Sequence, residues 1–494
     1  MRPILLPVIG GAIALLSSLA PQCSAAQVAQ PSAQKPNIVL IFADDLGWKD
    51  TGFTGSDFYE TPNIDRLAKQ GMVFSTAYAS AANCAPSRAC LMSGQYTPRH
   101  GVYAVGDTER GPKNQMRMVP IPNKGGLAPE NVTVAEALKA GGYATGIFGK
   151  WHLSGRDGAP PAQQGFDTVF DAQGKGEGRG DKGPAEDPKY VFKMADEVGT
   201  FMEKNKQHPF FAYVAHDAVH APLAARPESL AKFRAKAKGT HGNALYAANI
   251  YDFDASVGKL MQKISDLGLE KNTLVVFTSD NGAPKGVRSS QEPLRGNKGA
   301  YYEAGIREPM WAVWPGVIKA GTKCDVPVCN IDFYPTFLAA TKTAVPADKV
   351  LDGESLLPLF QQQGTLKRDA LFWHFPGYLN NPVSRPRDTI FRTRPVSVIR
   401  KGDWKLLLYH EEWQLDGGRA KVATNHAVEL YNLADDVGER RDLANENVAK
   451  RDELLNDLLA WIEKTKAPLP SQPNPAYAPQ DAPAGGEKDT TDHD

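Results

Sequence analysis

The amino-acid sequence predicts an α/β protein with a large mixed, mainly parallel central sheet flanked by helices, and a small C-terminal α+β lobe built on an antiparallel sheet. Three observations support this prediction. Short, continuous apolar segments are typical of strands that are covered on both faces. These segments alternate with helical patterns, as in layered α/β domains. After residue 385 the pattern changes to short segments of alternating polarity.

Five apolar segments are the predicted strands of the central sheet: 37–43, 144–148, 210–215, 274–278 and 310–314. Four of them lead directly into polar clusters, which contain Asp44 and Asp45, Lys150 and His152, His216 and His220, and Asp280 and Asn281. Open α/β sheets bind ligands beyond the carboxyl ends of their strands. We therefore expect these clusters to converge on one site.

Helix signals lie between the predicted strands. One helix should begin at Pro62 and end before Gly71, a second should begin at a capping box over 133–136, and a third should span 243–266. The C-terminal lobe should contain strands over 396–399, 404–409 and 428–433 and a helix over 447–465. Residues 106–131 and 154–188 are polar and glycine-rich, which predicts surface loops.

The 494 residues suffice for one large domain and a smaller one. Residues 1–26 have the features of an export signal: an early arginine, an apolar run and a stretch of small residues. We expect a main domain over 35–385, a C-terminal subdomain over 386–467 and a proline-rich, acidic, disordered tail over 468–494. The protein should be exported, either to the periplasm or by secretion.

Composition argues against two classes of partner. The 56 basic residues balance 56 acidic ones, so the chain has no global positive field that would attract nucleic acid. After the signal segment, no stretch approaches the roughly 20 apolar residues of a membrane span. We expect neither a nucleic-acid partner nor a membrane span.

Four cysteines remain beyond the signal segment: Cys84, Cys90, Cys324 and Cys329. Cys324 and Cys329 are close enough in the chain to pair in an oxidising compartment, but spacing alone does not establish the geometry, so both states stay open. Cys90 is predicted to be a small buried helix residue.

A cluster of oxygen ligands is predicted at the strand ends. Asp44 and Asp45 are adjacent carboxylates after a buried strand, where they repel each other unless a cation is present. Together with Asp280 and Asn281 they suit a hard ion such as calcium or magnesium. The alternative is a capped turn at residues 44–45 and an Asx-turn at residues 280–282.

The segment from Cys84 to Arg88 has the features of an anion site. Pro86 suits the first turn of a helix, whose N-terminus attracts anions, and Arg88 can add charge-assisted hydrogen bonds. The alternatives for Cys84 are a buried structural thiol, a disulfide partner, or the nucleophile of a thiol hydrolase with His152 or His220.

Residues 84–94 and 142–152 resemble the two signatures of the type I, formylglycine-dependent sulfatases of the alkaline phosphatase superfamily. Residues 36–45, 220–222, 278–282 and 296–309 also resemble that family. The resemblance implies an alkaline-phosphatase-like fold for the main domain. It also implies that a maturase converts Cys84 to formylglycine (3-oxoalanine), the nucleophile of a sulfuric ester hydrolase.

The resemblance also implies individual roles. Asp44, Asp45, Asp280 and Asn281 would bind one calcium ion together with residue 84. Arg88 and Lys150 would hold the hydrated aldehyde, and Lys150 and Lys298 would contact sulfate oxygens. His220 would protonate the leaving oxygen, and His152 would take a proton from the second hydroxyl of the aldehyde hydrate. His216 and His374 stay open between substrate contact and structure.

Several functions are compatible with these residues. Aromatic residues over 373–378, with Arg385, Arg387, Arg392 and Arg394, are either contacts for sugar rings and further sulfates or core aromatics and a solvated basic loop. We expect a sulfated carbohydrate or polysaccharide as substrate. The alternatives are an arylsulfatase for small aryl sulfates, a phosphonate or phosphodiester hydrolase of the same superfamily, and a glycan-binding protein with unmodified Cys84.

Overall fold

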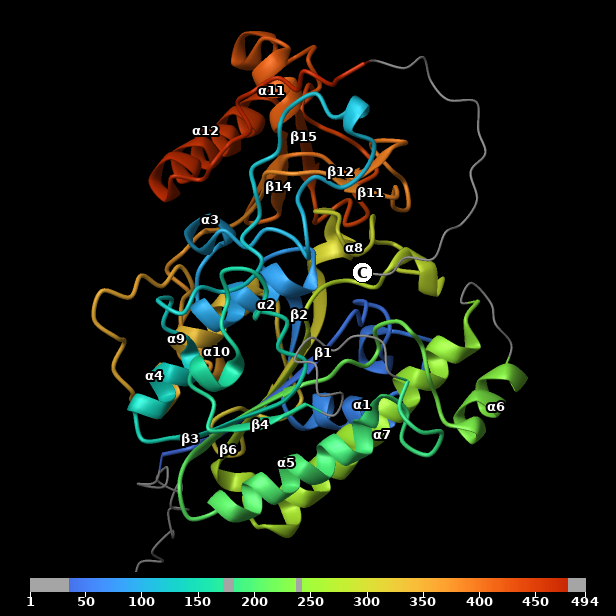
Figure 1. Cartoon of the computed structure of the whole chain (residues 1–494), viewed down its shortest axis with the longest axis vertical. Coiled ribbons are helices and arrows are strands. Elements are labelled where there is room, and N and C mark those ends of the chain that lie inside the picture. Colours follow the sequence, from blue (N-terminus) through green and yellow to red (C-terminus); the bar gives the residue numbers. More distant parts are fainter. Residues whose placement is uncertain (1–34, 172–181, 237–241, 479–494) are drawn as a thin grey trace, which may run out of the picture. The chain divides into compact units, whose positions relative to one another are not determined.

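A nine-stranded sheet organises the main domain in the computed structural model, which describes residues 35–171, 182–236 and 242–478 (Figure 1). Along the sheet, the order is β4 (Thr168–Phe170), β3 (Ala144–Gly149), β5 (Phe210–Ala215), β1 (Asn37–Ala43), β6 (Thr273–Ser279), β7 (Arg307–Val313), β2 (Met72–Tyr78) and β8 (Thr322–Cys324), with β9 (Val328–Cys329) also paired to β2. β7 pairs antiparallel with both β6 and β2, and the other pairs are parallel.

Helices cover both faces of this sheet. Ile38, Leu40 and Phe42 of β1 enter one core, which contains residues of α2 (Cys84–Ser93), α4 (Val134–Ala140) and α9 (Phe333–Thr341). Val39 and Ile41 enter the opposite core with α1 (Pro62–Gln70), α5 (Val191–Asn205) and α7 (Ala244–Asp266), and α5 and α7 run side by side below the sheet in Figure 1. Alternate burial along one strand is what a two-faced core requires.

The predicted fold class is confirmed. All five apolar segments form strands of the central sheet, and the predicted helices occur at residues 62–70, 134–140 and 244–266. The Thr133 hydroxyl accepts from the Glu136 N–H at 3.1 Å, and the Glu136 carboxylate accepts from the Thr133 N–H at 2.7 Å, so the capping box is formed. The prediction omitted β2, β4, β8 and β9.

The C-terminal lobe is a four-stranded antiparallel sheet in the order β10 (Ala370–Phe375), β13 (Val396–Lys401), β14 (Trp404–Tyr409) and β15 (Val428–Asn432). Residues of α12 (Val448–Thr465) share its core. β11 (Leu379–Asn380) and β12 (Phe391–Thr393) form a separate two-stranded ribbon. Since β10 precedes residue 385, the first strand of the small sheet comes from within the range predicted for the main domain, 35–385.

The remaining helices are short or lie at the edges. They are α3 (Thr97–His100), α6 (Pro227–Ala235), α8 (Glu303–Ile306), α10 (Leu357–Phe360) and α11 (His410–Leu415), together with the 3-10 turns at Gly52–Thr54, Lys113–Gln115, Pro161–Gln163, Pro188–Tyr190, Glu270–Asn272, Lys285–Val287, Asn330–Asp332 and Gly418–Lys421. Among the described residues, no helix is both long and apolar enough to cross a membrane.

Residues 468–478, at the start of the predicted tail, are hydrogen-bonded to a distant loop. The start of the tail is not disordered: the Val119 N–H donates to the Gln472 carbonyl at 2.9 Å, and the Asn474 amide donates to the Met116 carbonyl at 2.8 Å. Composition does not reveal such backbone pairing with a distant loop. Residues 479–494, the export signal over 1–26 and the glycine-rich run at 174–180 lie outside the described residues.

Cys324 and Cys329 do not pair, and both thiols are free. Both residues pair with β2, where Cys324 lies opposite Phe74 and Cys329 opposite Tyr78. Four residues along a strand correspond to about 13 Å, roughly twice the Cα separation that a disulfide tolerates. Cys90 is buried in α2 as predicted, with its Sγ 3.3 Å from Nε2 of His100.

One buried ion cluster joins the two sheets. Lys405 of β14 lies 3.0 Å from Glu303 of α8 and 2.8 Å from Glu439, and all three side chains are fully buried. Burial opposes ionisation of Glu303, but Lys405 and Arg307 outweigh it and lower its pKa. Burial raises the pKa of Glu439, and Lys405 offsets only part of that effect.

Replacing this lysine should destabilise the protein strongly. Lys405→Met leaves the buried Glu439 without this cation and leaves Glu303 to Arg307 at 3.3 Å, so we expect the free energy of unfolding at neutral pH to fall by about 3 kcal/mol or more. Urea unfolding measures the change. The control is Lys401→Met, which removes more exposed pairings with Asp369, Glu453 and Asp457 and should cost about 1 kcal/mol or less. Equal losses in the two variants would contradict the stabilising role of the buried cluster.

Candidate active site

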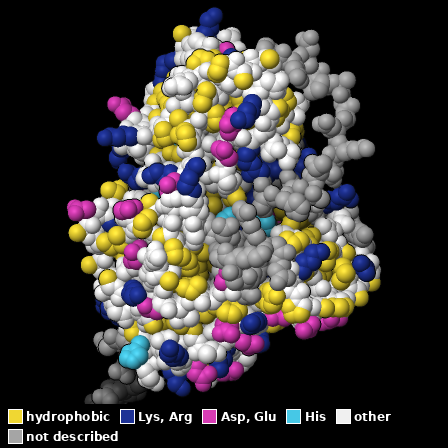
Figure 2. Space-filling view, viewed as in Figure 1, with side chains coloured by type: hydrophobic (Ala, Val, Ile, Leu, Met, Phe, Trp, Pro, Cys, Tyr) yellow, Lys and Arg dark blue, Asp and Glu magenta, His cyan; other side chains and the backbone are white. Residues whose placement is uncertain are grey.

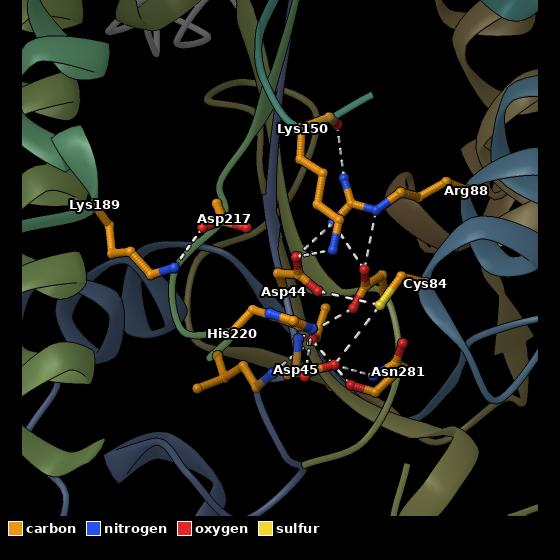
Figure 3. A network of polar contacts seen from close by, with 12 residues as sticks. Asp44, Asp45, Cys84, Arg88, Lys150, Lys189, Asp217, His220 and Asn281 are labelled. Atoms are coloured by element: carbon orange, nitrogen blue, oxygen red, sulfur yellow. Dashed lines mark hydrogen bonds and ion pairs between the residues drawn. The ribbon is translucent and has the colours of Figure 1, made fainter. Parts of the chain in front are cut away.

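The ends of four parallel strands bring most of the candidate residues to one edge of the sheet (Figure 3). Asp44 and Asp45 follow β1, Lys150 and His152 follow β3, His220 belongs to the segment after β5, and Asp280 and Asn281 follow β6. Cys84 and Arg88 lie one turn apart on α2, and Lys298 lies in the loop before α8. All ten residues are buried except the half-buried His152 and His220.

Backbone hydrogen bonds hold these strand ends together. The Asp44 N–H donates to the Ala218 carbonyl at 3.0 Å, and the Asp280 N–H donates to the Ala43 carbonyl at 3.2 Å. Asp45 has a φ of 64°, a left-handed conformation that aspartate tolerates better than most residues. In this conformation its N–H donates to Oδ1 of Asp280 at 3.1 Å. The adjacent carboxylates are therefore fixed by the turn that ends β1.

Three cations face the three carboxylates. The Lys150 ammonium lies 2.5 Å from Asp44, and the Lys298 ammonium lies 3.0 Å from Asp45. The Arg88 guanidinium donates to one oxygen of Asp280 through Nε at 3.0 Å and Nη2 at 2.7 Å. Because buried charges are stable only when paired, each acidic residue here depends on a basic one from another element.

The carboxylates of this cluster differ in their tendency to ionise. Burial opposes ionisation of Asp44, but Lys150, His220 and Arg88 outweigh it and hold its pKa well below the usual range. Burial and repulsion by Asp44 raise the pKa of Asp280 to about 7, even though Arg88 is bound to it. A further cation at these oxygens would reduce this repulsion.

The Cys84 thiol is buried beside these acids. Its Sγ lies 3.4 Å from Oδ1 of Asp44 and 3.9 Å from Oδ1 of Asp45. Burial, Asp280 and Asp44 raise the pKa of the thiol well above its usual value. Since the thiolate is the reactive form of cysteine, this environment suppresses thiol nucleophilicity. The buried carboxylates beside Sγ therefore disfavour the thiol-hydrolase alternative as long as no cation neutralises them.

The donor set fits a hard divalent cation. Ligand atoms of Asp44, Asp45, Cys84 and His220 all lie within 4.8 Å of one another. The Asn281 amide donates to Oδ1 of Asp45 at 2.6 Å, while its own buried Oδ1 has no hydrogen-bond partner in the part of the chain that the structure describes. An unsatisfied buried oxygen is costly, and amide and carboxylate oxygens are calcium ligands.

Burial lowers the pKa values of both candidate histidines. Burial, Lys150 and Arg88 lower the pKa of His152 well below its usual value, and its buried Nδ1 lacks a hydrogen-bond partner among the described residues. Burial and Lys298 lower the pKa of His220, although Asp45 opposes them. The His220 Nδ1 lies 2.5 Å from the Ala221 carbonyl, and its Nε2 faces Asp45 at 3.6 Å.

His216 and His374 are both buried and packed against other residues of the protein. The buried His216 ring packs edge-on against Phe253 with centroids 4.7 Å apart, and burial lowers its pKa to about 3. His374 lies in β10, with Nδ1 2.8 Å from the Ser397 hydroxyl and Nε2 3.0 Å from the Pro468 carbonyl.

The proposed aromatic and basic substrate contacts are mostly occupied within the C-terminal lobe. Trp373 is buried and donates to the Ala79 carbonyl. Arg387 pairs with Glu412 and Glu429, Arg394 pairs with Asp388 and Glu411, and Arg385 donates to backbone carbonyls of Pro293 and Gly438. Arg392 differs from these residues because it contacts the candidate site: its guanidinium donates to the carbonyl of Lys298 at 3.2 Å. These contacts favour the structural interpretation for Trp373, Arg385, Arg387 and Arg394.

Sequence reasoning missed a buried ion pair next to the site, labelled in Figure 3. Lys189 and Asp217 are 2.5 Å apart, and both side chains are buried. The Asp217 carbonyl accepts from the His220 N–H at 3.0 Å, so the pair supports the turn that carries His220. The position of Asp217 between His216 and His220 was a usable signal, but nothing in the sequence indicated Lys189 as its partner.

Comparison with known proteins identifies the family. Residues 36–343 match the sulfatase family model, and residues 297–466 match the model of the N-sulphoglucosamine sulphohydrolase C-terminal region. A sulfatase of Formosa agariphila is 32% identical, with 91% of this chain and 93% of that protein covered. The mouse N-acetylgalactosamine-6-sulfatase is 30% identical, with 90% and 89% covered.

A solved structure is also similar. It is the crystal structure of Ps i-CgsB in complex with k-i-k-neocarrahexaose, which has 29% sequence identity and a TM-score of 0.68. The alignment covers 89% of this chain and 95% of that one. Both the main domain and the small C-terminal sheet therefore have counterparts in known proteins.

Proposed function

The chain belongs to the sulfatase family and is a sulfuric ester hydrolase, and we propose that it removes sulfate from a sulfated carbohydrate or polysaccharide. We further propose that Cys84 is converted to formylglycine and that one Ca²⁺ is bound by Asp44, Asp45, Asp280, Asn281 and residue 84. The observation that carries this proposal is the position of Cys84, at the start of α2 and within hydrogen-bonding range of Asp44.

The modified residue and the metal would supply distinct chemistry. The hydrated aldehyde would supply one hydroxyl to displace the alcohol from sulfur and a second hydroxyl whose deprotonation would expel sulfate and restore the aldehyde, while Ca²⁺ would offset negative charge at the site. Arg88 lies four residues after position 84, on the same side of α2, and is fixed by Asp280. With Lys150 it would hold residue 84 in its reactive orientation.

The lysines would bind the sulfate group. Lys150 and Lys298 each pair with one of the carboxylates that the metal would share. Calcium binding would therefore weaken the hold of Asp44 and Asp45 on the two ammonium groups, which could then contact sulfate oxygens. This arrangement uses the same two cations for folding and for anion recognition.

The histidines would move the protons. Burial and Lys150 lower the pKa of His152 and so favour its neutral form, whose ring would accept the proton of the second hydroxyl. His220 would protonate the departing alcohol oxygen. A bound anionic ester raises the pKa of a neighbouring histidine and so opposes the lowering by burial that His220 otherwise experiences.

Two kinds of relative support a glycan substrate. One relative is named for N-acetylgalactosamine 6-sulfate, and the similar crystal structure contains a neocarrahexaose. Paired kinetics on a sulfated sugar, an aryl sulfate and a phosphodiester of the same alcohol would distinguish the carbohydrate proposal from the arylsulfatase and phosphodiester alternatives. A clear preference for either of the last two would contradict it.

Export and maturation complete the proposal. Residues 1–26 would direct the protein to the periplasm or the medium. Cys84 is only 1% exposed, so a maturase would need to reach this residue before the domain closes around α2. A sulfated glycan outside the cytoplasm is a suitable substrate for such a protein.

Residue 84 should carry the activity. Cys84→Ser leaves one hydroxyl and no second one to release sulfate, so we expect kcat to fall by about 10³-fold or more. The control is Cys324→Ser, a half-buried cysteine on β8, which should retain activity. Mass spectrometry of protein from the native host should show the aldehyde at residue 84 and an N-terminus near residue 27. An unmodified thiol in fully active enzyme would contradict the proposal, and a retained Met1 would contradict export.

Metal removal should lower activity and stability together. Chelation removes the counter-charge of the carboxylate cluster, so both turnover and the thermal midpoint should fall and should recover with added Ca²⁺. At a concentration near 1,000 times Kd, the ion should stabilise the fold by about 4 kcal/mol. Asn281→Ala should weaken this calcium-dependent shift in melting. Full activity of metal-free protein would remove calcium from the proposal.

His220 should matter most for poor leaving groups. His220→Ala is expected to reduce kcat/KM for a sugar sulfate by about 10²-fold or more, because the alkoxide leaves without a proton. The loss should be much smaller for 4-nitrophenyl sulfate, whose leaving group is stable as an anion. His216→Ala, on the same loop, should affect both substrates equally. An equal loss in His220→Ala would contradict its role as general acid.

A further inference from the structure

A cavity of about 410 Å³ lies beside the reactive residues. Its lining includes Ala85, which follows Cys84 on α2, and His152, so a molecule in the cavity lies next to the atoms proposed to react. The other lining residues are Val105, Gly106, Asp107, Gly125, Gly155 and Arg156. The volume lies within the range of small-molecule pockets.

Figure 2 shows histidine side chains (cyan) near the middle of the viewed face, with Lys and Arg side chains (dark blue) above them.

Backbone rather than bulky side chains forms much of the cavity wall. A Cβ on Gly155 would lie 2.3 Å from the Gly125 carbonyl, and a Cβ on Gly125 would lie 2.8 Å from the Arg156 nitrogen. Glycine at positions 125 and 155 therefore allows the two loops to approach each other closely. Gly106 is different: its φ is 71°, and a Cβ there would meet nothing within 4 Å. Glycines from three separate loops therefore contribute to the lining of the cavity.

Two side chains of opposite charge line this glycine-rich wall. Arg156 is exposed and donates through Nη2 to the Asn123 carbonyl at 2.9 Å, with Asp157 3.8 Å from its Nε. A guanidinium has five N–H donors, more than these contacts use. Asp107 is also exposed, and its Oδ1 accepts from the Glu109 N–H at 3.2 Å. An ionised carboxylate accepts several hydrogen bonds at once.

We propose that this cavity binds the sugar that carries the scissile sulfate, with Asp107 accepting hydrogen bonds from sugar hydroxyls and Arg156 binding a second anionic group of the same glycan. The inference rests on the proposed function and narrows the substrate to a glycan with more than one anionic group. Carboxylate and sulfate both match the donor geometry of arginine. The negative charge of Asp107 disfavours an anionic group on its own side of the cavity, which would fix the orientation of the sugar.

The inference can be tested with substrates that differ only in the second anion. The probes are sulfated hexoses and hexosamines, each with and without a linked hexuronate, and 4-nitrophenyl sulfate. Arg156→Gln should reduce kcat/KM about tenfold or more for the hexuronate-linked substrates, mainly through KM. It should leave the monosaccharide sulfates and the aryl sulfate within about twofold. Asp107→Asn should reduce kcat/KM for every sugar sulfate but not for the aryl sulfate.

A matched variant and the failure patterns complete the test. Arg66→Gln removes an exposed arginine of α1 that lies outside the cavity lining. This variant should leave kcat/KM unchanged for all three substrate classes. If Arg156→Gln affects all substrates equally, or none of them, the cavity proposal is wrong while the proposed function stands. If the wild-type enzyme cleaves the aryl sulfate but no sugar sulfate, the proposed function is wrong, and the cavity inference falls with it.

Discussion

The pairing of Asp44, Asp45 and Asp280 with Lys150, Lys298 and Arg88 is the constraint on which the site depends. These six side chains are all buried, and each carboxylate is paired with a cation from another element of the fold. Arg88 ties α2 to the end of β6, and Lys150 ties the end of β3 to the end of β1. A change in any of these contacts would move Cys84 relative to the carboxylates.

The fold was predictable because its signals are local. A continuous apolar strand can be recognised from its own residues alone, and all five predicted segments form strands. β2 was missed because it is less uniform: Val73 and Ser75 are half-buried, whereas every residue of β1 is buried. The short strands β4, β8 and β9 contain two or three residues each, which is too few for a periodic pattern.

The ten candidate site residues came from motif resemblance and from the rule that strand ends converge, and the structure places them together. Partners outside those motifs could not be predicted. Lys189 reaches Asp217 from 28 residues away, out of a segment that directly follows the predicted surface loop over 154–188. Such pairings depend on tertiary distance, which no pattern in a single sequence encodes. The same reason explains why the order of residues 468–478 was missed.

The C-terminal lobe holds part of the site in place and is not a separate module. The segment that carries Lys298 runs directly into α8, whose Glu303 is neutralised by Lys405 of the small sheet. Arg392 donates to the Lys298 carbonyl, and a Cβ on Gly299 would lie 2.5 Å from the Arg392 side chain. Both sides of the Lys298 loop are therefore fixed by residues that follow β10. Since Lys298 is the partner of Asp45, the position of a carboxylate at the end of β1 depends on packing that begins some 90 residues after Lys298.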